Sequence, residues 1–226
     1  MHIIENIPFS LDRQEIAKKL RVSPEGPQEV LLDKLLLKAR EIIKPRAVYQ
    51  VSYVYEKGED TVKIDSITFK SRILRVNLDQ AGKVFPYVVT VGEEFDKAGK
   101  ACSDMLLKYY LDELANYSLS KAQEYILEHL EKIYALGKSS RMNPGSLVDW
   151  PLEQQRHLFA LLGPEKVKEA LGVNLTPSFL MVPVKSVSGL IFQAEKSFKS
   201  CQVCPREDCS GRRAPYNEKQ LKDYTK

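Results

Sequence analysis

Apolar side chains in the first 43 residues recur with the period of a helix. Residues 10–20 place Leu11, Ile16 and Leu20 on one face, and Ser10 can cap that segment. Residues 28–43 carry a broader apolar stripe, wide enough to be buried against a sheet. The sequence therefore begins with two predicted helices.

The period then changes to that of β-strands. Residues 47–55 are rich in Val and Tyr, and short strand-like segments follow at 61–64, 67–69, 73–76 and 84–91. The segments between them are too short to hold helices, so the strands are expected to pair mainly antiparallel.

A long helical pattern runs from residue 101 to residue 134 and would reach roughly 50 Å at 1.5 Å per residue. Residues 137–150 are predicted as a loop. This organisation predicts an α+β fold with helices packed on a twisted antiparallel sheet.

Two short helices are predicted next, at 151–162 and 164–171, because each has proline in its first turn. Residues 178–184 and 186–192 are then expected to form a closing β-hairpin.

Composition limits the class of protein. Hydrophobic residues make up 43% of the chain and charged residues 28%, which is typical of a globular protein. No apolar run approaches the roughly 18 residues that span a bilayer, so no membrane association is expected. The first residues lack a basic, then apolar, export signal, which favours the cytoplasm. A net charge of +4 gives no argument for nucleic acid.

Charge and cysteine divide the chain into two parts. Residues 195–226 hold eight Lys and Arg against five Asp and Glu, together with three of the four cysteines. We therefore predict a nearly neutral body at 1–194 and a basic, cysteine-containing C-terminal tail at 195–226.

Familiar catalytic patterns are missing from the sequence. It has no glycine-rich phosphate loop and no nucleophile-and-base motif, and its three histidines lie far apart. No catalytic side chain is predicted, and the function is expected to rest on binding and positioning.

The tail cysteines suggest a metal site. Cys201, Cys204 and Cys209 bring three soft thiols onto one short segment, which suits zinc or an iron–sulfur cluster, with Cys102 as a possible fourth ligand. Reduced thiols, or a redox disulfide between Cys201 and Cys204, are the alternatives.

Two further segments offer guanidinium groups. The pair Arg212-Arg213 suits an anionic partner or phosphate, the alternative being a solvated tail. In residues 140–146, Pro144 and Gly145 fix an irregular backbone beside Arg141, which can bind a carboxylate through two hydrogen bonds. An amino-acid group attached to a flat base would fit this segment; an ordinary turn is the alternative.

Four segments in a fixed order resemble a known family. They are residues 141–145 (RMNPG), 149–155 (DWPLEQQ), 175–181 (LTPSFLM) and 186–189 (SVSG). Together they resemble the activation domain of cobalamin (vitamin B12)-dependent methionine synthase, and its stand-alone activation-subunit relatives still more.

The resemblance implies a C-shaped α+β domain that binds S-adenosylmethionine (SAM) on its concave side. It implies a role in reactivating an oxidised corrinoid methyltransferase by reductive methylation, with SAM as the methyl donor. The implied partners are cobalamin-dependent methionine synthase or another corrinoid protein, which carries the cobalamin, and a flavodoxin- or ferredoxin-type electron donor.

The resemblance also assigns site residues. Arg141 matches the arginine that holds the SAM carboxylate, and Met142, Pro144, Gly145 and Ser146 match the loop around the ligand, although the family usually has Tyr in place of Ser146. Asn116 falls where the family has a carboxylate near the SAM amino group.

Two other functions are compatible with these residues. The protein could be a non-catalytic corrinoid-protein-binding or electron-delivering accessory, with a cluster on the tail cysteines and a vestigial SAM site. It could also be a corrinoid-binding chaperone that docks a partner without reacting.

Overall fold

The computed structural model describes residues 1–23, 26–195, 197–209 and 211–225. Its helices are α1 (Arg13–Leu20), α2 (Pro27–Ile42), α3 (Arg72–Asn77), α4 (Glu93–Ala101), α5 (Met105–Tyr134), α6 (Gln155–Leu162), α7 (Pro164–Leu171) and α8 (Glu218–Thr225), with short 3-10 turns η1 (Leu152–Gln154) and η2 (Ser200–Gln202). Its strands are β1 (His2–Ile4), β2 (Arg46–Tyr49), β3 (Ser52–Lys57), β4 (Thr61–Ile64), β5 (Ile67–Lys70), β6 (Lys83–Thr90), β7 (Ser139–Met142), β8 (Asn174–Leu175), β9 (Met181–Val182) and β10 (Ser186–Gln193).

The main sheet is built around β6. This strand pairs with β2 and β3 on one side and with β10 on the other. β10 also pairs with β7, which has no other strand partner among the described residues. Every one of these pairings is antiparallel, so the predicted α+β fold with an antiparallel sheet is confirmed.

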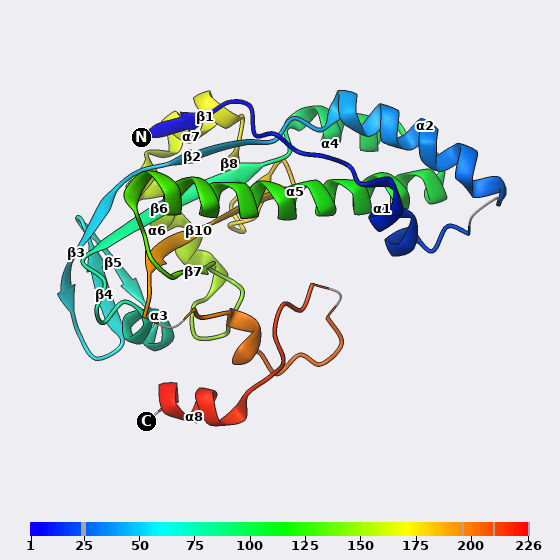
Figure 1. Cartoon of the computed structure of the whole chain (residues 1–226). Coiled ribbons are helices and arrows are strands. Elements are labelled where there is room, and N and C mark those ends of the chain that lie inside the picture. The colour runs from blue at the N-terminus through cyan, green and yellow to red at the C-terminus, as the bar shows by residue number, and fades with distance from the viewer. Residues whose placement is uncertain (24–25, 196, 210, 226) are drawn as a thin grey trace.

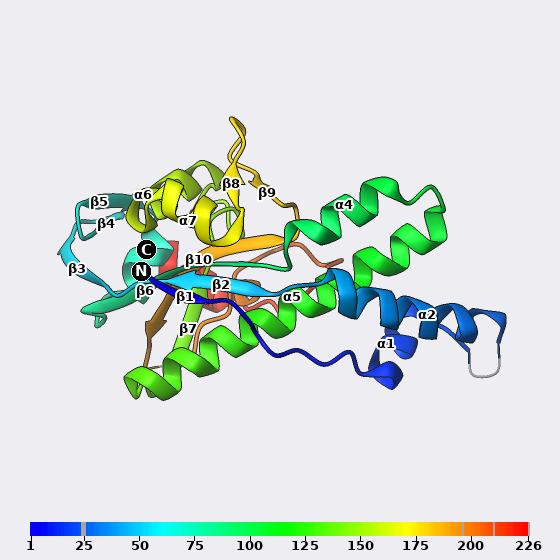
Figure 2. The same ribbon diagram turned by 90° about the horizontal axis from the view of Figure 1, so that it is seen from above.

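Helices cover both faces of this sheet, as Figures 1 and 2 show. Tyr87 on β6 packs in one cluster with Ala122 and Ile126 of α5. The neighbouring Val88 packs on the opposite face with Phe159 and other residues of α6 and α7. Successive strand side chains point to opposite faces, which explains why β6 is buried on both sides.

Helix α5 is longer than the sheet that it covers. At 1.5 Å per residue its 30 residues extend about 45 Å. Its first half leaves the sheet and packs with α1, α2 and α4, where Leu111 and Leu114 join Leu32 and Leu35 in a separate apolar cluster. One helix thus connects the sheet to a helical lobe, on the right in both views (Figures 1 and 2).

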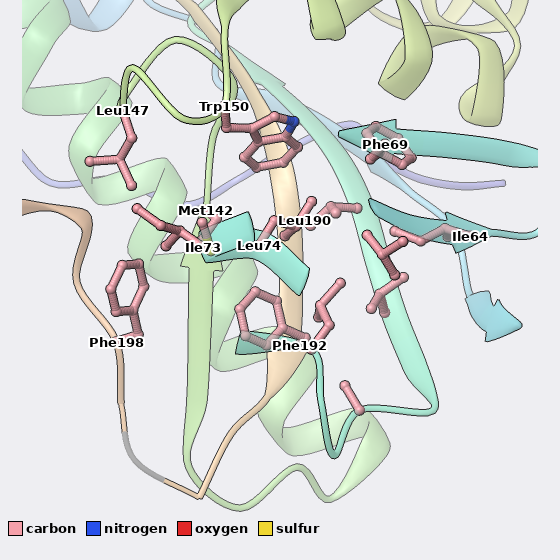
Figure 3. Close-up of a cluster of buried hydrophobic side chains, with 14 of the residues drawn as sticks. Ile64, Phe69, Ile73, Leu74, Met142, Leu147, Trp150, Leu190, Phe192 and Phe198 are labelled. Carbon is pink, nitrogen blue, oxygen red and sulfur yellow. The ribbon is translucent and has the colours of Figure 1, made fainter. Parts of the chain in front are cut away.

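A fourth cluster joins the tail to the body. Met142, Trp150 and Leu190 pack with Phe198 and Val203, both of which follow residue 194. Figure 3 shows the labelled side chains of this cluster, with Phe198 entering from the tail. The tail therefore contributes buried side chains to the core of the body, while its α8 ends beside α3 (Figure 1).

One predicted strand is a helix. Residues 73–76 lie in α3 because its first turn is capped: the Ser71 hydroxyl accepts the Leu74 N–H at 2.9 Å. The Asp149 carboxylate, far away in sequence, accepts the Ile73 N–H at 3.0 Å. A cap supplied by tertiary structure has outweighed a β-type local pattern.

Helix boundaries also differ from the predictions. The first helix begins at Arg13, because Asp12 rather than Ser10 is its cap. The predicted long helix is confirmed as α5 but begins at Met105, since the Asp104 carboxylate caps it by accepting the N–H groups of Leu106 and Leu107. The shorter helix α4 before it was not predicted. The helix predicted at 151–162 begins with the 3-10 turn η1.

Some of the predicted strands differ in extent, and one predicted pairing is wrong. Residues 47–55 form two strands, β2 and β3, and the predicted loop at 137–150 contains β7. The predicted hairpin is absent among the described strands, because β10 pairs with β6 and β7, while β9 pairs with β8. None of the described helices is long and apolar enough to cross a membrane.

Candidate functional site

The candidate site begins where β7 ends. Met142 faces the apolar cluster with Trp150 and is 1% exposed. Arg141, its neighbour on the strand, points to the other face, the one covered by α5, because side chains alternate along a strand. Met142 therefore anchors the strand, and Arg141 is the group available for binding.

Arg141 carries a positive charge into a largely buried place. Its Nη1 atom is buried and has no hydrogen-bond partner among the described residues. Burial lowers the pKa of Arg141, and the charge of Arg213 acts in the same direction. A buried guanidinium nitrogen without an acceptor is costly, and an anionic ligand would remove that cost.

Tyr87 is the buried polar group next to Arg141. Burial raises the pKa of its phenol, while the nearby charge of Arg141 acts in the opposite direction. Asn143 donates to the Tyr87 hydroxyl at 2.9 Å and to the Ser188 carbonyl oxygen at 2.6 Å. These two bonds fix the first residue after β7 against both β6 and β10.

Gly189 is the reason that Asn143 can come so close to β10. A Cβ atom placed on Gly189 would lie 2.4 Å from the Met142 carbonyl oxygen and 2.4 Å from Asn143 Nδ2. Only glycine leaves room for this approach, so the SVSG segment has a structural explanation.

The turn after Asn143 is held by backbone bonds. Gly145 has φ = +80°, and its N–H donates to the Trp150 carbonyl oxygen at 2.8 Å. The Ser146 N–H donates to the Asn143 carbonyl oxygen at 3.2 Å. Pro144 is buried and Ser146 is exposed, so this turn presents its backbone and the Ser146 hydroxyl outward.

The DWPLEQQ segment supports this turn. Asp149 caps α3, as described above. Gln154 hydrogen-bonds both backbone groups of Lys70: its side-chain oxygen accepts the Lys70 N–H at 2.9 Å, and its side-chain nitrogen donates to the Lys70 carbonyl oxygen. Gln155 accepts the Ser188 hydroxyl at 2.9 Å and donates to the Phe179 carbonyl oxygen at 3.1 Å. Most of this motif therefore holds the loop in place through buried hydrogen bonds.

A hollow of about 330 Å³ lies against this loop; we call it the β7 hollow. The residues lining it come from six parts of the chain: Gln123, Asn143, Pro144, Gly145, Ser146, Leu152, Gln155, Met181, Val187, Ser188 and Arg213. Its size lies within the range of small-molecule sites, roughly 300–1,000 Å³.

A larger hollow of about 650 Å³ lies elsewhere, around Lys83, Tyr134 and Glu195. None of the four motif segments contributes to its lining. The β7 hollow is therefore the better candidate, because the motif residues converge on it.

The predicted site residues are only partly brought together. Pro144, Gly145 and Ser146 line the β7 hollow, and Arg141 lies behind it beside Tyr87. Asn116 does not line it.

Asn116 is engaged elsewhere on α5. Its side-chain oxygen accepts from Lys185 Nζ at 2.8 Å, and the same Nζ pairs with Asp112 at 2.8 Å. Gln123, two turns farther along α5, is the residue of this helix that lines the hollow.

The tail reaches the hollow through an ordered segment, which we call the cysteine loop (residues 201–209 and 211–214). The Arg212 guanidinium donates to the carbonyl oxygens of Cys201 at 3.0 Å, Cys204 at 3.1 Å and Ala214 at 3.2 Å, and also to that of Arg206. The Arg212 side chain thus links several carbonyl groups of the loop by hydrogen bonds. Its neighbour Arg213 lines the β7 hollow.

The three cysteines of this loop differ in exposure and in their contacts. Cys201 accepts the Arg213 N–H at 3.4 Å, Cys204 is half-buried, and Cys209 is exposed. In the described part of the chain, no three His, Cys, Asp or Glu side chains gather as metal ligands would. Metal binding by Cys201, Cys204 and Cys209 stays a prediction from sequence, and no step is derived through a metal.

Three important residues were not among the predicted site residues. Tyr87 is hidden in an ordinary buried strand pattern, and Gln123 carries no local signal on α5. Arg213 was noted as a group for anions, but nothing in the sequence placed it at the β7 hollow.

Comparison with known proteins agrees with this geometry. Residues 137–208 match the family "Vitamin B12 dependent methionine synthase, activation domain", a range that includes β7, its loop and much of the cysteine loop. A search of curated proteins finds no match.

A solved structure shares the fold. It is the MetH reactivation domain bound to AdoHcy, with 21% sequence identity and a TM-score of 0.58, covering 84% of this chain and 68% of that one. The resemblance predicted from sequence to the methionine synthase activation domain is thus confirmed at the level of family match and fold.

Proposed function

We propose that this protein binds SAM in the β7 hollow and promotes the reductive methylation of a corrinoid held by a partner protein. The observation that carries the proposal is Arg141, a half-buried cation with one buried and unpaired nitrogen, on a segment that matches the activation-domain family. The AdoHcy bound to the reactivation domain of similar fold supports a ligand of this class.

The chain's own residues would act by binding and orienting. Arg141 would donate charge-assisted hydrogen bonds to the ligand carboxylate. Asn143, fixed by Tyr87 and Ser188, would keep the loop at one distance from the sheet. Precise placement of a reactive methyl group is a large contribution to rate and requires no acid or base from the protein.

The chemistry itself would come from the two substrates. A one-electron donor of flavodoxin or ferredoxin type reduces the oxidised corrinoid, and the SAM methyl group is transferred to it, leaving S-adenosylhomocysteine. Cobalamin-dependent methionine synthase is the first partner to test, and another corrinoid protein the second.

The direct test is an anaerobic assay. A candidate partner in the cob(II)alamin form is mixed with SAM, a reductant and this protein, and conversion to methylcobalamin is followed by absorbance. We expect conversion only when all components are present. Equal rates with and without this protein would contradict the proposal.

Arg141→Gln provides the matched variant, since glutamine keeps hydrogen-bonding ability but removes the charge. We expect it to weaken S-adenosylhomocysteine binding by at least tenfold in equilibrium dialysis. A tenfold change corresponds to a loss of about 1.4 kcal/mol in binding free energy. Arg206→Ala, at an exposed arginine of the tail, is the control and should bind as the wild type does.

A further inference from the structure

Two arginines from distant parts of the sequence lie close to Tyr87 beside the β7 hollow, and one of them lines it. Arg141 comes from β7, and Arg213 comes from the cysteine loop and lines the hollow itself. Both lie near the Tyr87 hydroxyl, and each acts on the same phenol through its charge.

The charge of Glu124 acts on Arg141, but no carboxylate pairs directly with either arginine in the described structure. Neither guanidinium forms a salt bridge with any described residue. Arg213 acts on Arg141 in the direction expected for two cations, lowering its pKa. Bringing two positive charges together at a partly buried place costs free energy, unless an anion lies between them.

The position of Arg213 is fixed by structure in the tail. Its N–H donates to Cys201 Sγ at 3.4 Å, and the adjacent Arg212 binds the carbonyl oxygens of the surrounding loop. Phe198 and Val203 anchor the same segment in the core, at 3% exposure each. A residue whose backbone is held in this way loses less conformational entropy on binding than an arginine on a free tail would.

We infer that Arg213 is a second carboxylate-binding residue, which the tail adds to the β7 hollow so that the amino-acid end of the ligand is held between Arg213 and Arg141. This inference rests on the proposed function and assigns one end of the ligand to one part of the protein. The adenosine end then lies toward the part of the hollow lined by Leu152 and Met181, because these are the largest of its apolar side chains.

The test pairs a protein variant with a ligand variant. Binding of S-adenosylhomocysteine and of methylthioadenosine, which lacks the amino-acid group, is measured by equilibrium dialysis on the full chain. For Arg213→Gln we expect about tenfold weaker binding of S-adenosylhomocysteine and unchanged binding of methylthioadenosine. Raising the salt concentration should reduce the difference in S-adenosylhomocysteine affinity between the wild type and Arg213→Gln, because Arg213 is exposed and its charge is screened.

The outcomes separate the two proposals. If the wild type binds neither ligand, the proposed function itself fails. If the wild type binds S-adenosylhomocysteine and Arg213→Gln binds it equally well, the role of Arg213 is overturned while the proposed function stands. If Arg213→Gln weakens both ligands equally, Arg213 shapes the hollow and does not bind the carboxylate. Arg206→Ala, another tail arginine, is the control for general loss of positive charge.

Discussion

The loop after β7 and the cysteine loop reach the same hollow, but they are held in place by different interactions. The loop after β7 lies over a buried apolar cluster, and Asn143, Asp149 and Gln155 fix it by hydrogen bonds to distant backbone. The cysteine loop has Val203 in the core, but the rest of it is arranged around one guanidinium. The order of the loop after β7 should therefore depend on packing, and the order of the cysteine loop on the single side chain of Arg212.

The largest effect is expected at Trp150, which is fully buried beneath the β7 loop. Trp150→Ala should lower the free energy of unfolding by about 3–5 kcal/mol, because it leaves a large cavity. Urea unfolding followed by circular dichroism measures this change. Tryptophan fluorescence cannot be used, because Trp150 is the one tryptophan of the sequence and the variant lacks it. Val148→Ala, at a side chain 99% exposed, should change the value by less than about 0.5 kcal/mol.

Gly189→Ala tests the approach of the β7 loop to β10. The added methyl group would lie 2.4 Å from the Met142 carbonyl oxygen, so we expect a loss of about 1–3 kcal/mol in unfolding free energy. Gly99→Ala, with no atom within 4 Å of the new methyl group, is the control and should be neutral or stabilising within α4. Equal effects of the two substitutions would show that Asn143 does not need this close contact.

Arg212→Ala tests whether one side chain organises the cysteine loop. Because the carbonyl groups that it binds can regain water, we expect a global loss of about 1 kcal/mol or less. The local effect should be clear: faster amide exchange at Asn217, whose N–H donates to the Gln202 carbonyl oxygen at 2.7 Å. Unchanged exchange at Asn217 would mean that Phe198 and Val203 suffice to order the loop.

The smallest effect concerns the Cys201 thiol. Burial raises its pKa, but the hydrogen bonds and charge of Arg213, with a hydrogen bond from Ala214, outweigh burial and leave the pKa below its ordinary value. The thiolate therefore stabilises the folded loop at high pH, and this contribution is lost as pH falls through the folded pKa.

Arg213→Gln should move the pH midpoint of Cys201 alkylation upward, because the charge that favours the thiolate is removed. Mass spectrometry of iodoacetamide-treated protein over a pH series measures this midpoint. A midpoint that does not move would show that the backbone hydrogen bonds of residues 213 and 214 set the pKa of Cys201 without the Arg213 side chain.

The sequence predicted what depends on local pattern. The two N-terminal helices, β4 and α7 follow from periodicity and proline, and the RMNPG segment marked the loop at the hollow. It did not predict α3, because the cap on that helix includes Asp149, which lies more than 70 residues away.

The site was harder to predict than the fold. Arg141 could be found because its motif is contiguous, whereas Gln123 and Arg213 reach the hollow only through tertiary structure. Asn116 was assigned by resemblance, yet its side chain is bound to Lys185. The difference lies in which residues share a short motif and which meet only after folding.

The tail also packs against β7, the last described strand of the sheet on the β10 side. The Phe198 N–H donates to the Ser140 hydroxyl of β7 at 2.7 Å, on a strand whose one described strand partner is β10. Open strand edges tend to pair with other molecules, and covering them is a common protection against aggregation. Removing the tail should therefore cost the protein its solubility at high concentration, independently of any effect on ligand binding.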